Sequence, residues 1–432
     1  MHRRMLFSLL GAVTLTACSD SATGPRTDTR ALTPRRDVID AAGDFHRYVA
    51  IGTSVSQGWR SDGVNTTSQE TSWPAQLAQL AGRTLSLPSI AFPGCGAPLA
   101  APLASGLRVN GESAAAPFLS RTCAANVAGV TLPTGNVAIS GARTTHALTA
   151  TPESPDPSYA PLYARILPPG MSQVTAMESQ NPKIVSVELG ANEVLGTREG
   201  AYVPGQTVVP VSFWAPAYRE VVSRVARVTK HAVLVGLIDH AIAFPSFRTG
   251  AELWAARATF TPFNVAVSED CSVEPGSANA LFVPVRVALA AGEGAARARA
   301  GLSPAILSCA NAPATDANGI VIRDYVLGPS EMAQLDAQFA AMNAVIRAEA
   351  EARGFAYFTL GALYENANVK APFSAITMLT SAQPYGPLVS LDGLHPSAEG
   401  SRVLAEAAAN ALSSQYGMVF PNLGATPLVM AR

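Results

Sequence analysis

The stretch VAIGTSVSQG, residues 49–58, contains an apolar run that stops at Gly52, with two hydroxyl side chains, Thr53 and Ser54, directly after it. A short, continuously apolar run of this kind is typical of a strand that is buried on both faces. Ser54 is then expected at the carboxyl end of that strand. Two roles are open for its side chain: a nucleophile, or a polar cap for the next turn.

Further apolar runs alternate with helix-like segments along the rest of the chain. Strands are predicted at 46–52, 136–140, 183–190, 231–239 and 355–360, and helices at 72–82, 212–230, 329–354 and 397–417. This alternation predicts an α/β fold with a parallel sheet and helices on both faces. In such sheets, ligands bind at the carboxyl ends of the strands.

The domain organisation follows from the same pattern. Nothing marks a boundary inside 45–417, so we expect one domain there. Two long irregular stretches, at about 85–134 and 245–325, are expected to be loop insertions that wall the cleft over the strand ends. Residues 418–432 are expected to form a C-terminal tail.

Chemically capable residues follow several of the predicted strands. Ser54 follows the first, Gly141 in NVAISGA the second, and Asn192 in VELGANE the third, while LDGLHP carries Asp392 and His395. A serine hydroxyl needs a base, which His395 can supply, and Asp392 can orient that imidazole. The backbone N–H groups of Ser54 and Gly141 and the Asn192 amide can stabilise an oxyanion. The set is sufficient for acyl transfer.

The motifs GTS, NVAISGA, GANE and DGLH, in this order, resemble those of the SGNH hydrolases, also called GDSL esterases/lipases. The resemblance covers most of 46–415 outside the two insertions. It implies a flavodoxin-like, three-layer α/β/α sandwich and hydrolysis of carboxylic esters without a metal or other cofactor. It also implies the triad Ser54, Asp392 and His395, with Ser54, Gly141 and Asn192 as the oxyanion hole.

This sequence departs from the family pattern at two positions. Thr53 precedes the nucleophile, where an Asp is usual, and Glu193 follows Asn192, where an Asp is also usual. Neither residue is the nucleophile, the base or an oxyanion donor, so we expect activity to survive. The local geometry around Ser54 and Asn192 is where a consequence is expected.

The N-terminal residues are typical of an export signal. A basic MHRR is followed by a short apolar run and by LTAC, which ends in Cys18. LTAC resembles a bacterial lipoprotein box, which implies a signal peptide over 1–17 and a lipid on Cys18. The polar segment 18–44 is expected to be a flexible tether. The chain is therefore expected to be exported and held by lipid to the bacterial cell envelope, in the periplasm or on the outer surface.

Four more cysteines remain after Cys18. An even number in an oxidising compartment predicts two disulfides. Three connectivities are possible, and the local pairs Cys95–Cys123 and Cys271–Cys309 are favoured because each closes one loop-like segment. No CxxC pair or HExxH motif indicates a zinc site.

Composition limits the class of partner. The formal net charge of −1 gives no basic footprint, so nucleic acid is not an expected partner. The expected substrate is a small-molecule, lipid or glycan ester, with short acyl chains preferred. The alternatives are an acyltransferase or deacetylase that acts on glycans, and a non-catalytic surface lipoprotein that binds glycans or acyl chains.

Overall fold

The core is a parallel sheet whose strand order is β10-β4-β3-β2. The computed structural model describes residues 39–366 and 368–424. Within them the sheet strands are β2 (Tyr48–Gly52), β3 (Ile184–Glu188), β4 (His231–Gly236) and β10 (Ala356–Thr359). Every residue of β2 and β3 is buried, which agrees with their continuously apolar sequences.

The strand predicted at 136–140 is not a regular strand, but the segment does extend the sheet. Asn136 is bridged in parallel to Ala50, and the N–H groups of Val137 and Ile139 donate to Ala50 and Gly52. Counted with this segment, the sheet has the flavodoxin-like order 2-1-3-4-5. The ladder is incomplete because the Gly52 N–H donates to the Gln173 side chain at 3.1 Å instead of to this segment.

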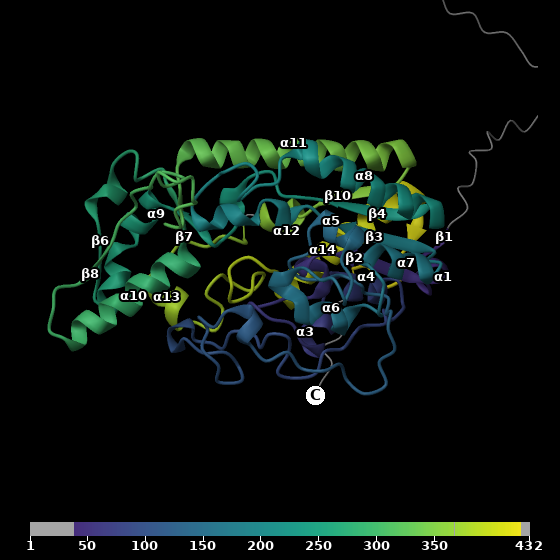
Figure 1. Cartoon of the computed structure of the whole chain (residues 1–432), viewed down its shortest axis with the longest axis horizontal. Helices are drawn as coiled ribbons and strands as arrows, with labels where there is room; N and C mark the ends of the chain where they lie inside the picture. Colours follow the sequence, from purple (N-terminus) through teal and green to yellow (C-terminus); the bar gives the residue numbers. More distant parts are fainter. Residues whose placement is uncertain (1–38, 367, 425–432) are drawn as a thin grey trace, which may run out of the picture. The chain divides into compact units, whose positions relative to one another are not determined.

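Helices cover both faces of the sheet, so the fold is a three-layer α/β/α sandwich (Figure 1). The helix α14 packs against α4 and β10 on one face. On the other face α11 packs against β4 and α8, and α7 packs against α8. These helices are α4 (Trp73–Leu80), α7 (Gln173–Ser179), α8 (Val211–Val228), α11 (Pro329–Arg353) and α14 (Ala398–Tyr416). The predicted fold class is confirmed.

The first insertion, 85–134, is mainly irregular, as expected. It contains two short 3-10 turns, Leu103–Ser105 and Phe118–Ser120, and a disulfide between Cys95 and Cys123. The helices α3 (Thr66–Glu70), α5 (Thr144–Thr149) and α6 (Ala160–Ile166) lie outside it in sequence.

The second insertion, 245–325, is more regular than expected. It contains an antiparallel sheet of order β5-β7-β9, a parallel β6-β8 pair and a 17-residue helix, α10. The elements are β5 (Phe247–Thr249), α9 (Gly250–Ala255), β6 (Val265–Val267), β7 (Ala280–Phe282), α10 (Val283–Arg299) and β8 (Ala305–Leu307), with β9 (Val326–Leu327) just beyond. Strands of two or three residues are too short to show a period in the sequence.

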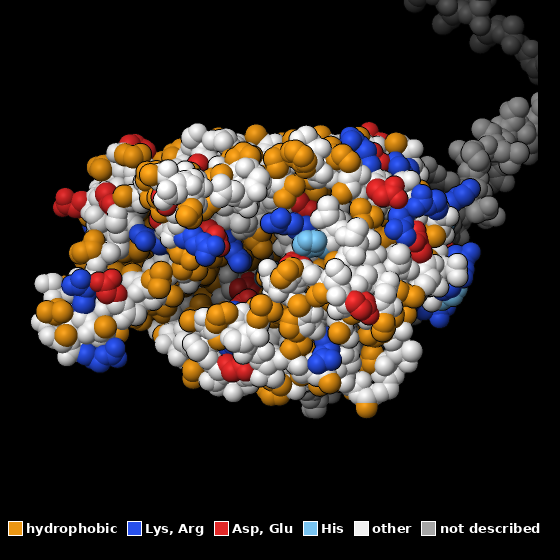
Figure 2. All heavy atoms as spheres, viewed as in Figure 1, with side chains coloured by type: hydrophobic (Ala, Val, Ile, Leu, Met, Phe, Trp, Pro, Cys, Tyr) orange, Lys and Arg blue, Asp and Glu red, His pale blue; other side chains and the backbone are white. Residues whose placement is uncertain are grey.

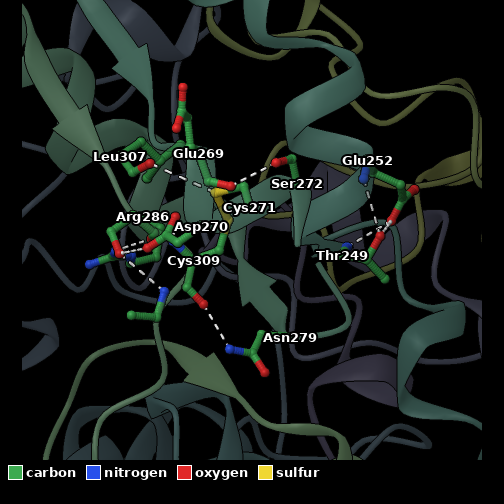
Figure 3. Close-up of a disulfide and its surroundings, with 12 residues drawn as sticks. Thr249, Glu252, Glu269, Asp270, Cys271, Ser272, Asn279, Arg286, Leu307 and Cys309 are labelled. Carbon is green, nitrogen blue, oxygen red and sulfur yellow. Dashed lines mark hydrogen bonds between the residues drawn. A yellow bond between two sulfur atoms is a disulfide. The ribbon is translucent and has the colours of Figure 1, made fainter. Parts of the chain in front are cut away.

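A disulfide between Cys271 and Cys309 crosses this second insertion (Figure 3). Both cysteines are fully buried, and the Asn279 side chain donates to the Cys309 carbonyl at 2.8 Å. Both disulfides are therefore the local pairs that the sequence favours. Two disulfides fit a protein of an oxidising compartment.

The two ends of the described chain pair with each other. The strand β1 (Ile39–Asp40) runs parallel to β11 (Met418–Val419), and α1 (Ala41–Phe45) follows β1. Residues 39–44, at the end of the expected tether, thus form a strand and a helix, and the expected tail begins as a strand. Sequence reasoning missed both because a two-residue strand carries no pattern of its own.

Cys18 and the predicted signal peptide lie outside the described residues. Within residues 39–366 and 368–424, none of the helices has the length and apolar character needed to cross a bilayer. The short helices α12 (Gly361–Tyr364) and α13 (Ala375–Thr380) complete the fold before α14.

Candidate active site

Ser54 lies at the carboxyl end of β2, as the first residue of the short helix α2 (Ser54–Gln57). The helix cap position is held by Thr53, not by Ser54. The Ser54 hydroxyl instead lies 2.9 Å from Nε2 of His395, and the residue is 7% exposed. The hydroxyl is thus paired with a base rather than used as a cap.

His395 and Asp392 come from the turn before α14. Nδ1 of His395 lies 2.9 Å from Oδ2 of Asp392, so Ser54, His395 and Asp392 form a continuous hydrogen-bonded chain. Ser397 ends the turn by capping α14, because its hydroxyl accepts from the Gly400 N–H at 3.1 Å. The three-residue spacing of DGLH lets the Asp392 carboxylate reach Nδ1 of the His395 ring.

The carboxylate of Asp392 has donors on both oxygens. Its Oδ1 accepts the N–H groups of Leu394 and His395, each at 2.9 Å, and the Ser390 hydroxyl at 3.1 Å. Oδ2 accepts the Asp62 N–H at 2.8 Å as well as facing His395. Burial by itself would raise the pKa of Asp392. His395 and the backbone donors outweigh that effect, so the pKa lies well below the usual range of an aspartate. The group is therefore an anion at neutral pH.

A buried acid, Glu188 at the end of β3, holds the loop that carries Ser54. It accepts the N–H and hydroxyl of Thr53 and the N–H and hydroxyl of Ser56, at 2.8–3.2 Å. The Ser56 hydroxyl also accepts the Trp73 indole N–H at 3.1 Å. Burial raises the pKa of Glu188, and the four donors oppose that rise. Thr53 fits this position because it donates to a carboxylate that a second acid would repel.

Gly141 and Asn192, the two further oxyanion candidates, lie on loops that are joined to each other. The Asn192 side-chain amide donates to the Ala142 carbonyl at 2.9 Å. Among the residues that the structure describes, the backbone N–H groups of Ser54 and Gly141 have no acceptor. Gly141 has φ +77°, and an added Cβ would lie 2.1 Å from the Tyr159 ring, so only glycine fits.

Glu193 gives a second connection between the same two loops. Its carboxylate accepts the Thr144 N–H at 2.6 Å, at the start of α5, and the Thr144 hydroxyl accepts the Trp214 indole N–H. Burial raises the pKa of Glu193, and the Thr144 N–H opposes that rise. The departure from the family pattern at 193 therefore coincides with a buried contact that fixes the Gly141 loop relative to Asn192.

The first insertion contacts Asp392 through Asp62. The Asp62 carboxylate binds Arg108 at 2.6 Å and Arg121 at 2.8 Å, and both guanidinium groups also donate to its carbonyl oxygen. Ser61 and Asp62 have φ values of 53° and 57°, in the left-handed region. We call Asp62, Arg108 and Arg121 the arginine clamp. It fixes the N–H that donates to Asp392.

Two adjoining cavities open beside Ser54. The first has an empty volume of about 750 Å³, counting its mouth, and is lined mainly by apolar side chains from the end of β4, α11 and α12, together with Ser54, Asn192 and His395. The second is polar and is lined by Gly141, Asn192 and charged residues. Figure 2 shows a hollow in the region of α12 and α5, with Lys and Arg side chains at its rim.

The insertions wall these cavities less than expected. From 245–325 only Phe247 lines the apolar cavity, and no residue of 85–134 lines either one. The first insertion instead acts behind the site, through the arginine clamp. Its position could not be read from the sequence, because it depends on ion pairs between residues that lie 46 and 59 positions apart.

Comparisons with known proteins add little beyond the fold. No family model matches the chain, and no curated protein matches it. A solved structure described as a "putative GDSL-like lipase" from Parabacteroides merdae matches with a TM-score of 0.32 and 12% identity, over 86% of this chain and 94% of that chain. A match at this level carries no argument about function.

Proposed function

We propose that this protein is a serine ester hydrolase of the SGNH type. The observation that carries the proposal is the continuous chain from Ser54 Oγ through His395 to Asp392, with each step 2.9 Å long. A hydroxyl within hydrogen-bond reach of a base that is itself oriented by a carboxylate is the arrangement that activates serine.

The proposed reaction has two halves. Nε2 of His395 removes the hydroxyl proton of Ser54, and the Ser54 oxygen attacks the ester carbonyl carbon. The His395 imidazolium then gives that proton to the departing alcohol. The N–H groups of Ser54 and Gly141 and the amide of Asn192 stabilise the oxyanion. Nε2 of His395 then takes a proton from a water, whose oxygen attacks the acyl carbon. The bond from that carbon to Ser54 Oγ breaks, Ser54 recovers the proton from the imidazole, and the acid is released. Asp392 stays ionised throughout and stabilises the imidazolium.

Short acyl esters are the proposed substrate class. The apolar cavity is bounded by side chains of β4, α11 and α12, and the adjoining cavity is polar, so neither gives a long apolar groove. We therefore expect 4-nitrophenyl esters of short acids to be hydrolysed faster than those of long fatty acids. Long-chain esters as the fastest substrates would contradict this part of the proposal.

The catalytic assignment is tested with Ser54→Ala and His395→Ala. Each variant should lose at least about 10³-fold in kcat on 4-nitrophenyl butyrate, because the residues act as one unit. A fluorophosphonate probe should label the wild type and not Ser54→Ala, while circular dichroism shows both folded.

His240→Ala, at a histidine paired with Asp336 outside the site, is the control. Full activity in Ser54→Ala rejects the proposal, and absent labelling of wild type favours a binding protein.

We also propose that lipid on Cys18 anchors the protein to the cell envelope. The LTAC sequence supports this, and the two disulfides fit export. Expressed in a bacterium, the wild type should fractionate with membranes, whereas Cys18→Ser should remain unlipidated at this site. Mass spectrometry of the mature N-terminus decides, and a wild type that starts at another residue without lipid rejects the anchor.

A further inference from the structure

The two cavities beside Ser54 differ in character and meet at Asn192, Leu195 and Arg198, which line both. The first is built mostly from side chains such as Leu237, Phe244 and Phe339. The second is lined by polar and charged groups. They are Arg143, His146, Asp156, Ser158, Tyr159, Arg198 and Glu199. An ester whose carbonyl sits at Asn192 therefore has one side in an apolar environment and the other in a polar one.

The polar cavity contains two guanidinium groups that are available to a ligand. Within residues 39–366 and 368–424, the side chains of Arg143 and Arg198 form no ion pair or hydrogen bond. The acids nearby are already engaged: Asp156 accepts the Ser158 N–H at 2.9 Å and faces His146, and Glu199 pairs with Arg323 at 3.0 Å. Planar guanidinium groups are suited to carboxylate or phosphate.

The position of His395 indicates which part of the ester lies where. His395 must return a proton to the departing alcohol oxygen, and it lines the apolar cavity but not the polar one. Gly141, an oxyanion candidate, lines the polar cavity only. The alcohol part is thus expected in the apolar cavity, with the acyl part running past Asn192 toward the two arginines.

We propose that Arg143 and Arg198 form an anion subsite, so that the preferred substrates are esters of an apolar alcohol whose short acyl chain ends in an anionic group such as a carboxylate. This inference rests on the proposed function of Ser54 and specifies its substrate. Arg198 borders both cavities and is partly buried, whereas Arg143 is exposed, so Arg198 should contribute more.

Matched ester pairs test the subsite. Mono-4-nitrophenyl adipate and 4-nitrophenyl hexanoate have six-carbon acyl chains that differ only in a terminal carboxylate. After subtraction of spontaneous hydrolysis, kcat/KM should favour the adipate by about tenfold at low salt, and the preference should shrink as salt screens the charges. Arg198→Gln should remove most of the preference and Arg143→Gln a smaller part. Arg299→Gln, at an exposed arginine on α10, should leave activity and preference unchanged.

A second ester pair and a binding measurement make the outcome decisive. If the arginine-dependent preference appears only for an anionic leaving group, as in 4-hexanoyloxybenzoate against its methyl ester, the proposed orientation is wrong. Ser54→Ala should bind monohexyl adipate about tenfold more tightly than methyl hexyl adipate by calorimetry, and Arg198→Gln in that background should abolish the difference. Equal binding overturns the subsite even if no ester is hydrolysed. Normal turnover of the neutral ester without any preference rejects the subsite and leaves the proposed function intact.

Discussion

Asp392 connects the chemistry of the site to its stability. The pKa of Asp392 in the folded protein lies below its usual value, so its contacts stabilise the fold above about pH 4. That contribution is lost as the pH falls through the usual range toward the lowered folded-state value. The electrostatic interaction with His395 is the largest source of the lowered pKa, and hydrogen bonds from His395 and from the Leu394 N–H add to it.

We predict a pH-dependent cost for Asp392→Asn. At pH 7 the free energy of unfolding should fall by about 1–3 kcal/mol, as for the loss of hydrogen bonds to a charged group. Urea denaturation at pH 7, 5 and 3.5 should show this cost persisting at pH 5 and declining at pH 3.5. A cost that is the same at all three values would mean that the charge of Asp392 does not matter for stability.

Residues next to strand ends could be predicted from sequence because local order alone places them. Ser54 follows an apolar run directly, and Asp392 and His395 share a six-residue motif, so a parallel sheet brings them to one edge. Glu188 and Arg198 could not be identified this way. Glu188 looks like part of a buried strand, and its donors lie 132 and 135 positions away in the chain. Arg198 has no pattern that sets it apart from other arginines.

At the scale of elements, the first insertion contacts the active site through the turn that contains Asp62. The arginine clamp holds Asp62, whose N–H contacts Asp392, and Ser61 adds a contact to Ser390 at 2.9 Å. Non-glycine residues with positive φ cost about 1 kcal/mol each when nothing holds them. The clamp therefore keeps a strained turn in the position from which the Asp62 N–H donates to Asp392.

We predict that Arg121→Met lowers kcat on a neutral ester by about tenfold with little change in KM, because it loosens Asp392 rather than a substrate contact. Methionine keeps an apolar stem beside Phe118, over which the Arg121 guanidinium lies. The check is a double-mutant cycle with Asp392→Asn, in which the effect of Arg121→Met should shrink. Arg299→Met is the control. Additive effects in the cycle would show that Arg121 acts independently of Asp392.

The regular elements were predicted better than the insertions, and the reason is physical. The helices α8, α11 and α14 are long and amphipathic or well capped, so local sequence determines them. The strands β5, β6 and β7 have three residues each and exist because the second insertion packs on itself. Their pairing depends on residues far apart in sequence, such as Phe247 with Phe282.

For the whole molecule, the two disulfides should have separable effects. Each closes a loop of 28 or 38 residues, for which the chain-entropy model gives about 3.5–4 kcal/mol of stabilisation. We predict that both double Cys→Ser variants lower the melting temperature. Only loss of Cys95–Cys123 should also lower kcat, because that loop carries both arginines of the arginine clamp. Equal kcat in the two variants, measured below both melting temperatures, would contradict the role of the clamp.

The proposed triad joins the first and last parts of the fold, since 341 positions separate Ser54 from His395. The pairing of β1 with β11 has the same long reach. During synthesis from the N-terminus, Ser54 emerges long before its base, and a chain that ends before residue 395 lacks both His395 and α14. The hydrolase that we propose is therefore inactive as a nascent chain, and turnover begins only when α14 and the preceding turn with His395 have docked. Recovery of ester hydrolysis after refolding would accordingly report the joining of Ser54 with His395 rather than the folding of either segment alone.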